Sequence, residues 1–261
     1  MTTSEQPLDL GSGAAAVLDV LGFKAARKVH GAAKLVSSVR RYRDGVRRTA
    51  EMEAKFGRGE VTTATISDTV IMARQAAEKD ADGNVVTLGA TVRQLVLAAS
   101  QLVTIASAGS PALAFRGCIA AGELVATPDH IFVGQAIDEA AELAEQALGA
   151  MVWLTPAASS ALAVEEKTPL TLEWPVRLHD RGEVTAFVVN PFWLSAALAG
   201  SAESAAETLR ATLSLLMQPF GVSHAIDVVQ KQQNTARFLE YAENVTVSRW
   251  GEIRESAGLG G

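Results

Sequence analysis

Two aspartates lie in surroundings that are unusual for a charged side chain. Asp19 interrupts the apolar run "AAAVLDVLGF", where a carboxylate is costly to bury. Asp68 lies between two β-rich runs in "TISDTVIMA". Each has an ordinary explanation by itself, because Asp is common at helix N-caps and in hairpin turns. Together the two residues suggest chemistry that neither suggests alone.

Two carboxylates that share a site repel each other, and one becomes protonated unless a cation lies between them. Hard oxygen ligands suit Mg²⁺ or Mn²⁺, which proteins usually bind together with substrate phosphates. Gly22 follows shortly after Asp19 and precedes a helical pattern, and a helix N-terminus offers free N–H groups to phosphate. This corner could therefore hold two carboxylates, a pair of metal ions and a triphosphate.

Hydrophobic patterning predicts the elements that would bring the aspartates together. Their order is strand, helix, two strands, helix, strand, helix, strand, which is typical of the split βαβ, ferredoxin-like fold. This α+β fold has an antiparallel sheet with helices on one face, and its first strand lies beside the following hairpin. The predicted ranges are a strand at 14–21, a helix at 23–54, hairpin strands within 59–73, a helix at 87–107, a strand at 111–125, an extended piece at 130–134, a helix at 135–148 and a strand at 151–155.

The character of the chain changes after residue 165. A hairpin that turns at "HDRGE" and two helices are predicted there, without a Gly/Ser/Pro linker before them. We therefore predict a flexible N-terminus at 1–13, a catalytic domain at 14–165, a C-terminal extension at 166–255 packed on the same body, and a disordered tail at 256–261.

Composition limits the class of protein. The chain has 261 residues, a formal net charge of −6 and a hydrophobic share of 48%, which favours a globular protein and gives no indication of a nucleic-acid partner. Cys118 is the single cysteine, so an internal disulfide is excluded. The uncharged segment 94–115 is broken by polar residues and predicts a buried helix rather than a membrane insertion. A cytoplasmic location is expected.

Four segments, in order, resemble the class III nucleotide cyclases. They are "LDVLGFKAA", "TISDTVIMA", "FRGCIAAGEL" and "IFVGQAIDEAAELAE". The serine before Asp68, the unusual third segment and the long C-terminal part look most like the bacterial pyrimidine cyclases, uridylate or cytidylate, of the Pycsar anti-phage system.

The resemblance implies a metal site. Asp19 and Asp68 would hold two Mn²⁺ or Mg²⁺ ions, and the Val20 backbone carbonyl would add a ligand. The reaction would be attack of the substrate 3′-hydroxyl on the α-phosphorus, with pyrophosphate leaving.

It also implies a phosphate site. Gly22, Phe23 and Lys24 would line the triphosphate through their N–H groups, and Arg116 would contact the phosphates and complete the catalytic set.

Four positions depart from the family pattern. Asp138 and Glu142 stand where purine cyclases have a ribose-binding Asn and a transition-state Arg, and a carboxylate cannot stabilise developing phosphate charge. Ala64 and Ile131 replace the residues that read a purine base. The chain is therefore either a cyclase for another base or a degenerate one.

We favour an active cyclase for a pyrimidine, because an inactive domain has no chemical need for both metal aspartates, and UTP over CTP, because uridylate cyclases are the commoner of the similar proteins. Thr62, Thr65 or Tyr42 are candidates to read the base through hydroxyl groups. By resemblance, the enzyme would be a homodimer whose cyclic product, a second messenger in phage defence, is read by a separate effector protein. The alternative is an inactive cyclase-like sensor that binds a nucleotide or a protein. The choice of base and ion, the activating signal, the role of the extension and the transition-state residue stay open.

Overall fold

The computed structural model describes residues 11–55, 61–76, 83, 85–127, 129–163, 169–180, 182–218 and 225–257. Most of the predicted flexible N-terminus and of the predicted disordered tail lies outside these residues. The strands are β1 (Gly11–Val20), β2 (Thr62–Ile66), β3 (Thr69–Gln75), β4 (Phe115–Ala126), β5 (Phe132–Val133), β6 (Val152–Leu154), β7 (Thr171–Leu178) and β8 (Gly182–Val189). The helices are α1 (Phe23–His30), α2 (Ala32–Lys55), α3 (Leu88–Ser107), α4 (Gln135–Ala144), α5 (Pro156–Ala161), α7 (Trp193–Leu198), α8 (Ala202–Met217), α9 (Ile226–Ser248) and α10 (Trp250–Ser256).

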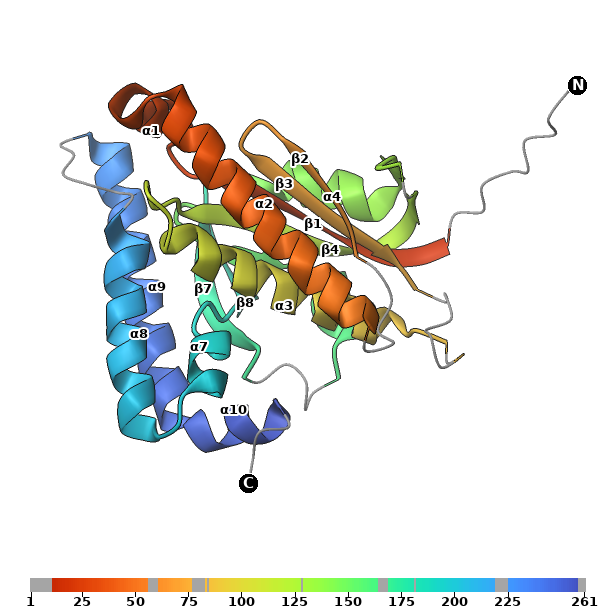
Figure 1. Cartoon of the computed structure of the whole chain (residues 1–261). Coiled ribbons are helices and arrows are strands. Elements are labelled where there is room, and N and C mark those ends of the chain that lie inside the picture. The colour runs from red at the N-terminus through yellow and green to blue at the C-terminus, as the bar shows by residue number, and fades with distance from the viewer. Residues whose placement is uncertain are drawn as a thin grey trace, which may run out of the picture.

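One mixed sheet runs through the molecule (Figure 1). The strand order is β2-β3-β1-β4-β6-β8-β7, and β5 pairs with β4. β1 pairs antiparallel with β3 and with β4, as the predicted neighbourhood of first strand and hairpin requires. β6 runs parallel to β4, so the sheet is not wholly antiparallel as predicted. The α+β fold class itself is confirmed.

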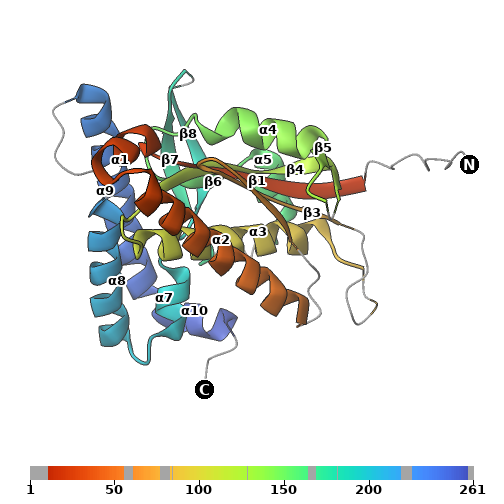
Figure 2. The same ribbon diagram turned by 45° about the horizontal axis from the view of Figure 1, so that its top comes forward.

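Helices cover both faces of this sheet, which corrects the prediction of helices on one face only. α2 and α3 share a core with Ala14, Ala16 and Leu18, whereas α4 packs on the opposite face with Ala15 and Val17. Figure 2 shows α4 on one side of the strands and α2 and α3 on the other. The physical reason is that β1 is apolar and buried on both faces, which is typical of a central strand covered from two sides.

The predicted helix at 23–54 is two helices, α1 and α2. Gly31 separates them with a φ of 80°, a backbone region that glycine adopts far more readily than other residues. α1 has no buried residue, whereas α2 places Leu35 and Tyr42 in the main core. α1 is therefore held much less firmly by packing than α2.

α3 is a core helix. Within the described part of the chain it is the one helix that is long and apolar enough to cross a membrane by length and composition, and 56% of its most apolar window is buried in the fold. Leu95 and Leu102 belong to the main core. This is how the central helix of a soluble domain packs.

The C-terminal hairpin continues the same sheet. Trp153 of β6 pairs with Val188 of β8, so the sheet crosses residue 165, and the division between domain and extension there stays a prediction. The two predicted helices are observed as α8 and α9, which lie side by side beyond the hairpin (Figure 1). α7 and α10 were not predicted, and Trp250 Nε1 joins them by donating to the Ala196 carbonyl at 3.1 Å.

α9 also holds the segment that leads into β6. Asn234 Nδ2 donates to the Leu148 carbonyl at 2.8 Å, and the Ala150 amide donates to the Thr235 hydroxyl at 2.9 Å. The chain between α4 and β6 is thus bonded to a helix that begins about 80 residues later.

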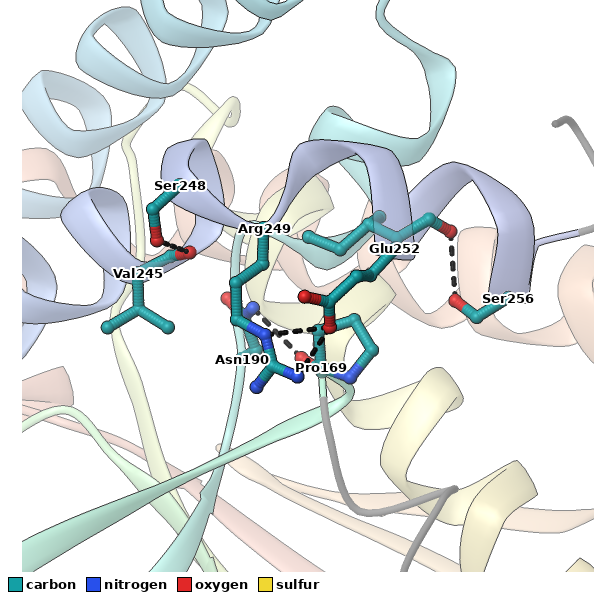
Figure 3. A network of polar contacts seen from close by, with 8 residues as sticks. Pro169, Asn190, Val245, Ser248, Arg249, Glu252 and Ser256 are labelled. Atoms are coloured by element: carbon teal, nitrogen blue, oxygen red, sulfur yellow. Dashed lines mark hydrogen bonds and ion pairs between the residues drawn. The ribbon is translucent and has the colours of Figure 1, made fainter.

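A buried polar centre lies where β8 ends (Figure 3). Asn190 Nδ2 donates to the Pro169 carbonyl at 3.1 Å and to the Thr246 hydroxyl at 3.0 Å, and Asn190 Oδ1 accepts from the Phe192 amide at 3.0 Å. These bonds join β8 to the segment before β7 and to α9. On the surface beside this centre, the Arg249 guanidinium pairs with the Glu252 carboxylate.

Candidate functional site

The register of β1 places Asp19 between two other strands. Asp19 lies opposite Thr69 of β3 on one side and opposite Arg116 of β4 on the other. The amide of Val20 donates to the backbone carbonyl of Asp68 at 3.2 Å. The end of β1 and the hairpin corner are therefore bonded to each other, and the structure brings the two predicted metal-binding aspartates together.

The electrostatics of Asp19 fit a cation site. Partial burial raises the pKa of the Asp19 carboxyl, and the nearby negative charges of Asp68 and Glu145 raise it further, whereas Arg116 lowers it. The side chain of Asp19 is only 16% exposed. The pair of aspartates is thus an incompletely neutralised group of carboxylates at the end of the sheet.

The hairpin that carries Asp68 turns sharply. Ser67 and Asp68 form its two-residue loop, and Ser67 has a φ of 57°. A side-chain-bearing residue in this left-handed region costs about 1–2 kcal/mol. The loop therefore holds Asp68 beside β1 at the expense of local backbone strain.

Gly22 forms the turn from β1 into α1. Its φ is 74°, and an added Cβ would meet no atom within 4 Å, so its backbone conformation is what favours glycine here. No side chain among the described residues caps α1, and its first N–H groups have no acceptor inside the helix. Lys24 is exposed and Phe23 packs partly against the main core. The backbone amides of Gly22, Phe23 and Lys24 begin three residues after Asp19 and are suited to bind an anion there.

Arg116 faces Asp19 from β4. Its Nη2 lies 3.6 Å from Asp19 Oδ2 and 3.3 Å from Glu145 Oε2, and its Nη1 donates to the Glu145 carbonyl at 2.7 Å. The side chain is buried, and its Nε has no hydrogen-bond acceptor among the described residues. Glu145 was missed by the sequence analysis, because no motif indicates that the residue after α4 meets the start of β4.

The base-reading candidates divide between the two faces of the sheet. Thr62 and Ala64 pair with Ala73 and Ile71, which belong to the α4 side, the side of Asp19. Thr65 pairs with Val70, which belongs to the core under α2 and α3. The structure thus brings Thr62 to the same face as Asp19 and does not bring Thr65 there.

Tyr42 reaches the aspartate corner from the core side. It is 1% exposed, its ring meets Phe115 edge-on with centroids 5.2 Å apart, and its hydroxyl has no hydrogen-bond partner within the described residues. Burial raises the pKa of the Tyr42 hydroxyl, and the charges of Asp68 and Asp19 raise it further. The side chain is therefore electrostatically close to both aspartates but sealed from solvent.

Three of the four positions that depart from the cyclase pattern are at the surface, and the fourth, Ala64, is half-buried in β2. Asp138 and Glu142 are exposed on α4, and Ile131 is 53% exposed just before β5.

The donor set fits a hard divalent cation. The described residues contain no group of three or more His, Cys, Asp or Glu side chains that could hold a metal ion. The negative charges of Asp19 and Asp68 repel each other. One or two carboxylates are nevertheless the usual protein contribution to Mg²⁺ sites, in which substrate phosphates and water supply the other oxygens.

Comparisons with known proteins agree with this fold. No protein-family model matches the chain, and a search of curated proteins found no match. Among solved structures, the catalytic core of a rhodopsin-guanylyl cyclase with converted specificity, in complex with ATPalphaS, is similar with a TM-score of 0.50 and 12% identity over 69% of this chain and 96% of that chain. The guanylyl cyclase domain of the RhoGC fusion protein from the fungus Blastocladiella emersonii, as a monomeric double mutant, has the same TM-score and identity over 69% and 95% of the two chains. The chain therefore has the fold of nucleotide cyclase catalytic domains, as the resemblance in its sequence predicts.

Proposed function

We propose that the protein is a metal-dependent nucleotide cyclase that converts a nucleoside triphosphate into its 3′,5′-cyclic monophosphate and pyrophosphate. The observation that carries this proposal is the corner where Asp19 and Asp68 meet, next to the Gly22 turn and the uncapped start of α1. A fold shared with nucleotide cyclase domains supports it.

Each residue of the corner has a role in the proposal. Asp19 and Asp68, with the Val20 carbonyl, would hold two Mg²⁺ or Mn²⁺ ions, which would favour the alkoxide at the 3′-oxygen and neutralise charge on the phosphates. The amides at Gly22, Phe23 and Lys24 would bind the triphosphate.

Arg116 is the cation available to the phosphates, and its buried Nε has no acceptor among the described residues. Most of the rate acceleration in such a phosphoryl transfer comes from positioning and electrostatics.

The substrate in this proposal is a pyrimidine nucleotide, UTP in preference to CTP. Ala64, on the Asp19 face, and the exposed Ile131 bring no charged group to the positions where purine cyclases read the base. Thr62 shares the Asp19 face and would offer a hydroxyl to a pyrimidine carbonyl, so we favour it over Thr65.

The proposal includes a cytoplasmic homodimer, and its product would serve as a second messenger for a separate effector in defence against phage. Ile66, which pairs with Thr69 beside Asp68, is 65% exposed and is available to a partner at this corner, whereas the exposed Ile131 and Val133 lie by β5, at the opposite end of β4.

The direct test is to incubate the protein with each of ATP, GTP, CTP and UTP in the presence of Mn²⁺. We expect a cyclic monophosphate and an equal amount of pyrophosphate from UTP, and less from CTP. The matched control is Asp68→Asn, which keeps the side-chain shape and removes the charge. Absence of cyclic product from all four nucleotides at high protein concentration would reject the cyclase proposal.

The second candidate is a sensor that binds a nucleotide without turnover. Arg116 is held by Asp19 and Glu145, and two exposed carboxylates, Asp138 and Glu142, occupy α4 where an active purine cyclase has catalytic side chains. A sensor would show a higher melting temperature with UTP and Mn²⁺ while releasing no pyrophosphate.

A further inference from the structure

Arg116 lies between two carboxylates on different elements. Its Nη2 is 3.6 Å from Asp19 Oδ2 and 3.3 Å from Glu145 Oε2, and its Nη1 donates to the Glu145 backbone carbonyl at 2.7 Å. Glu145 therefore binds the guanidinium through both its side chain and its main chain, and its two contacts are shorter than the one to Asp19. The guanidinium is buried, whereas the Glu145 side chain is 71% exposed.

The charges in this corner do not cancel. Asp19 lies near two other carboxyl groups, those of Asp68 and Glu145, and near one guanidinium, that of Arg116. Arg116 stabilises the charged form of Asp19, and the two other carboxylates oppose it. Without a metal ion, Arg116 thus provides the direct counter-charge for Asp19.

A divalent cation bound to Asp19 would change this balance. It would have to share the Asp19 carboxylate with the Arg116 guanidinium, whose Nη2 lies 3.6 Å from Asp19 Oδ2, and two positive charges on one partly buried carboxylate repel each other. The contact between Arg116 and Asp19 would weaken, while the bonds from Arg116 to Glu145 do not depend on Asp19.

We propose that Glu145 is a positioning residue that keeps the Arg116 guanidinium at the corner while drawing it off Asp19, so that a divalent cation can bind Asp19 and Asp68. Arg116 is then the counter-ion that the metal displaces from Asp19, and Glu145, which already contacts Arg116, is the residue that keeps holding it. The inference rests on the metal site of the proposed function but does not require turnover.

The test is a double-mutant cycle on Mn²⁺ binding to the metal-free protein, without nucleotide. The dissociation constant is measured by titration calorimetry and by the electron paramagnetic resonance signal of free Mn²⁺. We expect Arg116→Gln to tighten binding by about tenfold, because the competing charge is gone, and Glu145→Gln to weaken it by about tenfold, because Arg116 then stays on Asp19.

The decisive measurement is the double variant Glu145→Gln/Arg116→Gln. If Glu145 acts through Arg116, its substitution has no effect once Arg116 is absent, and the double variant binds Mn²⁺ like Arg116→Gln alone. If Glu145 acts only as a nearby negative charge, the tenfold loss persists in the double variant and the proposal is overturned. Glu123→Gln, which removes one exposed charge from the same strand as Arg116, controls for net charge and should leave binding unchanged.

The outcome separates this inference from the cyclase proposal. An unchanged Mn²⁺ affinity in Glu145→Gln, in a protein that makes cyclic nucleotide, rejects the role of Glu145 alone. The expected cycle of affinities in a protein that makes no cyclic product supports that role and rejects the enzyme. Failure of the wild-type protein to bind Mn²⁺ at millimolar concentration rejects the role of Glu145.

Discussion

The molecule contains two polar clusters that differ in how well their groups are paired. Around Asn190, the side-chain amide donates to two acceptors and its oxygen accepts from a backbone amide, all inside the core; Figure 3 shows the bond to Pro169. Around Asp19, two carboxylates share the Arg116 guanidinium, Asp68 adds a further negative charge, and the buried Nε of Arg116 has no acceptor within the described chain. A saturated buried network stabilises a unique fold, whereas an unsaturated one leaves free capacity for a ligand. The difference fits a structural role for the first cluster and supports the proposal that the second is the functional site.

The sharpest way to break this comparison is to neutralise the two aspartates that are proposed to bind metal. Asp19→Asn/Asp68→Asn should lower cyclase activity by roughly 100-fold or more, because no charged ligand for the cations remains. In metal-free buffer the same variant should unfold at a higher temperature than the wild type, because the repulsion between the two carboxylates is removed. A variant that is both inactive and clearly less stable would show that the aspartates are structural.

The reverse behaviour is expected at the Asn190 cluster. Asn190→Ala leaves the Pro169 carbonyl, the Phe192 amide and the Thr246 hydroxyl without their partner in the core, and should lower the free energy of unfolding by roughly 3 kcal/mol. Urea unfolding measures this loss. The control is Ser248→Ala, which removes an exposed hydrogen bond on α9, the helix that carries Thr246. Activity per folded molecule should be unchanged at low temperature, and a selective loss of activity would contradict a purely structural role.

A smaller effect is expected from pH. Burial and Asp68 raise the pKa of Asp19 above its usual value of 3.8, so the folded state binds this proton more tightly than the unfolded chain does. The contribution of Asp19 is fully present below that value and is lost as pH rises through the higher folded pKa. Without metal, the stability of Asp19→Asn relative to wild type should therefore increase with pH from about 3.5 upward. Unfolding curves in metal-free buffers at several pH values measure the difference, and a constant difference would mean that the pKa of Asp19 is not raised.

The smallest effect concerns the strained turn. Ser67→Gly removes the penalty of a left-handed serine but increases the freedom of the unfolded chain, so we expect a gain of at most about 1 kcal/mol in the free energy of unfolding. Thermal unfolding compared with Ser37→Gly, at an exposed helical position where glycine should destabilise, gives the sign. A loss at Ser67 as large as the loss at Ser37 would mean that the turn is not strained.

Local patterns predicted much of the fold and the corner itself. The apolar run before Gly22 and the β-branched runs around Ser67 and Asp68 are short-range signals, and they appear as β1 and as the hairpin. The meeting of Asp19 with Asp68 followed from strand order, because consecutive strands commonly become neighbours in a sheet.

The features that the sequence did not reveal depend on packing between distant elements. α4 covers the second face of the sheet because small residues such as Ala136 and Ala140 fit against β1 and β4, and periodicity does not say which face a helix covers. Gly31 interrupts a helical pattern that tolerates glycine, so only the backbone conformation reveals the break. The contact between Glu145 and Arg116 joins residues 29 positions apart and has no signature in either segment.

The bonds from α9 to the chain before β6 connect the C-terminal part to the corner that holds Asp19 and Arg116. Leu148 and Ala150, which α9 holds, lie between Glu145 and Met151, and the Met151 carbonyl accepts from the amide of Gly117, the neighbour of Arg116. A displacement of α9 would therefore shift the segment 145–151 at both of its ends, at Glu145 and at Met151. The last quarter of the chain is thus part of the scaffold that sets where the Arg116 guanidinium lies. Truncating it would make the position of Arg116 less fixed without removing any residue that is proposed to bind the nucleotide.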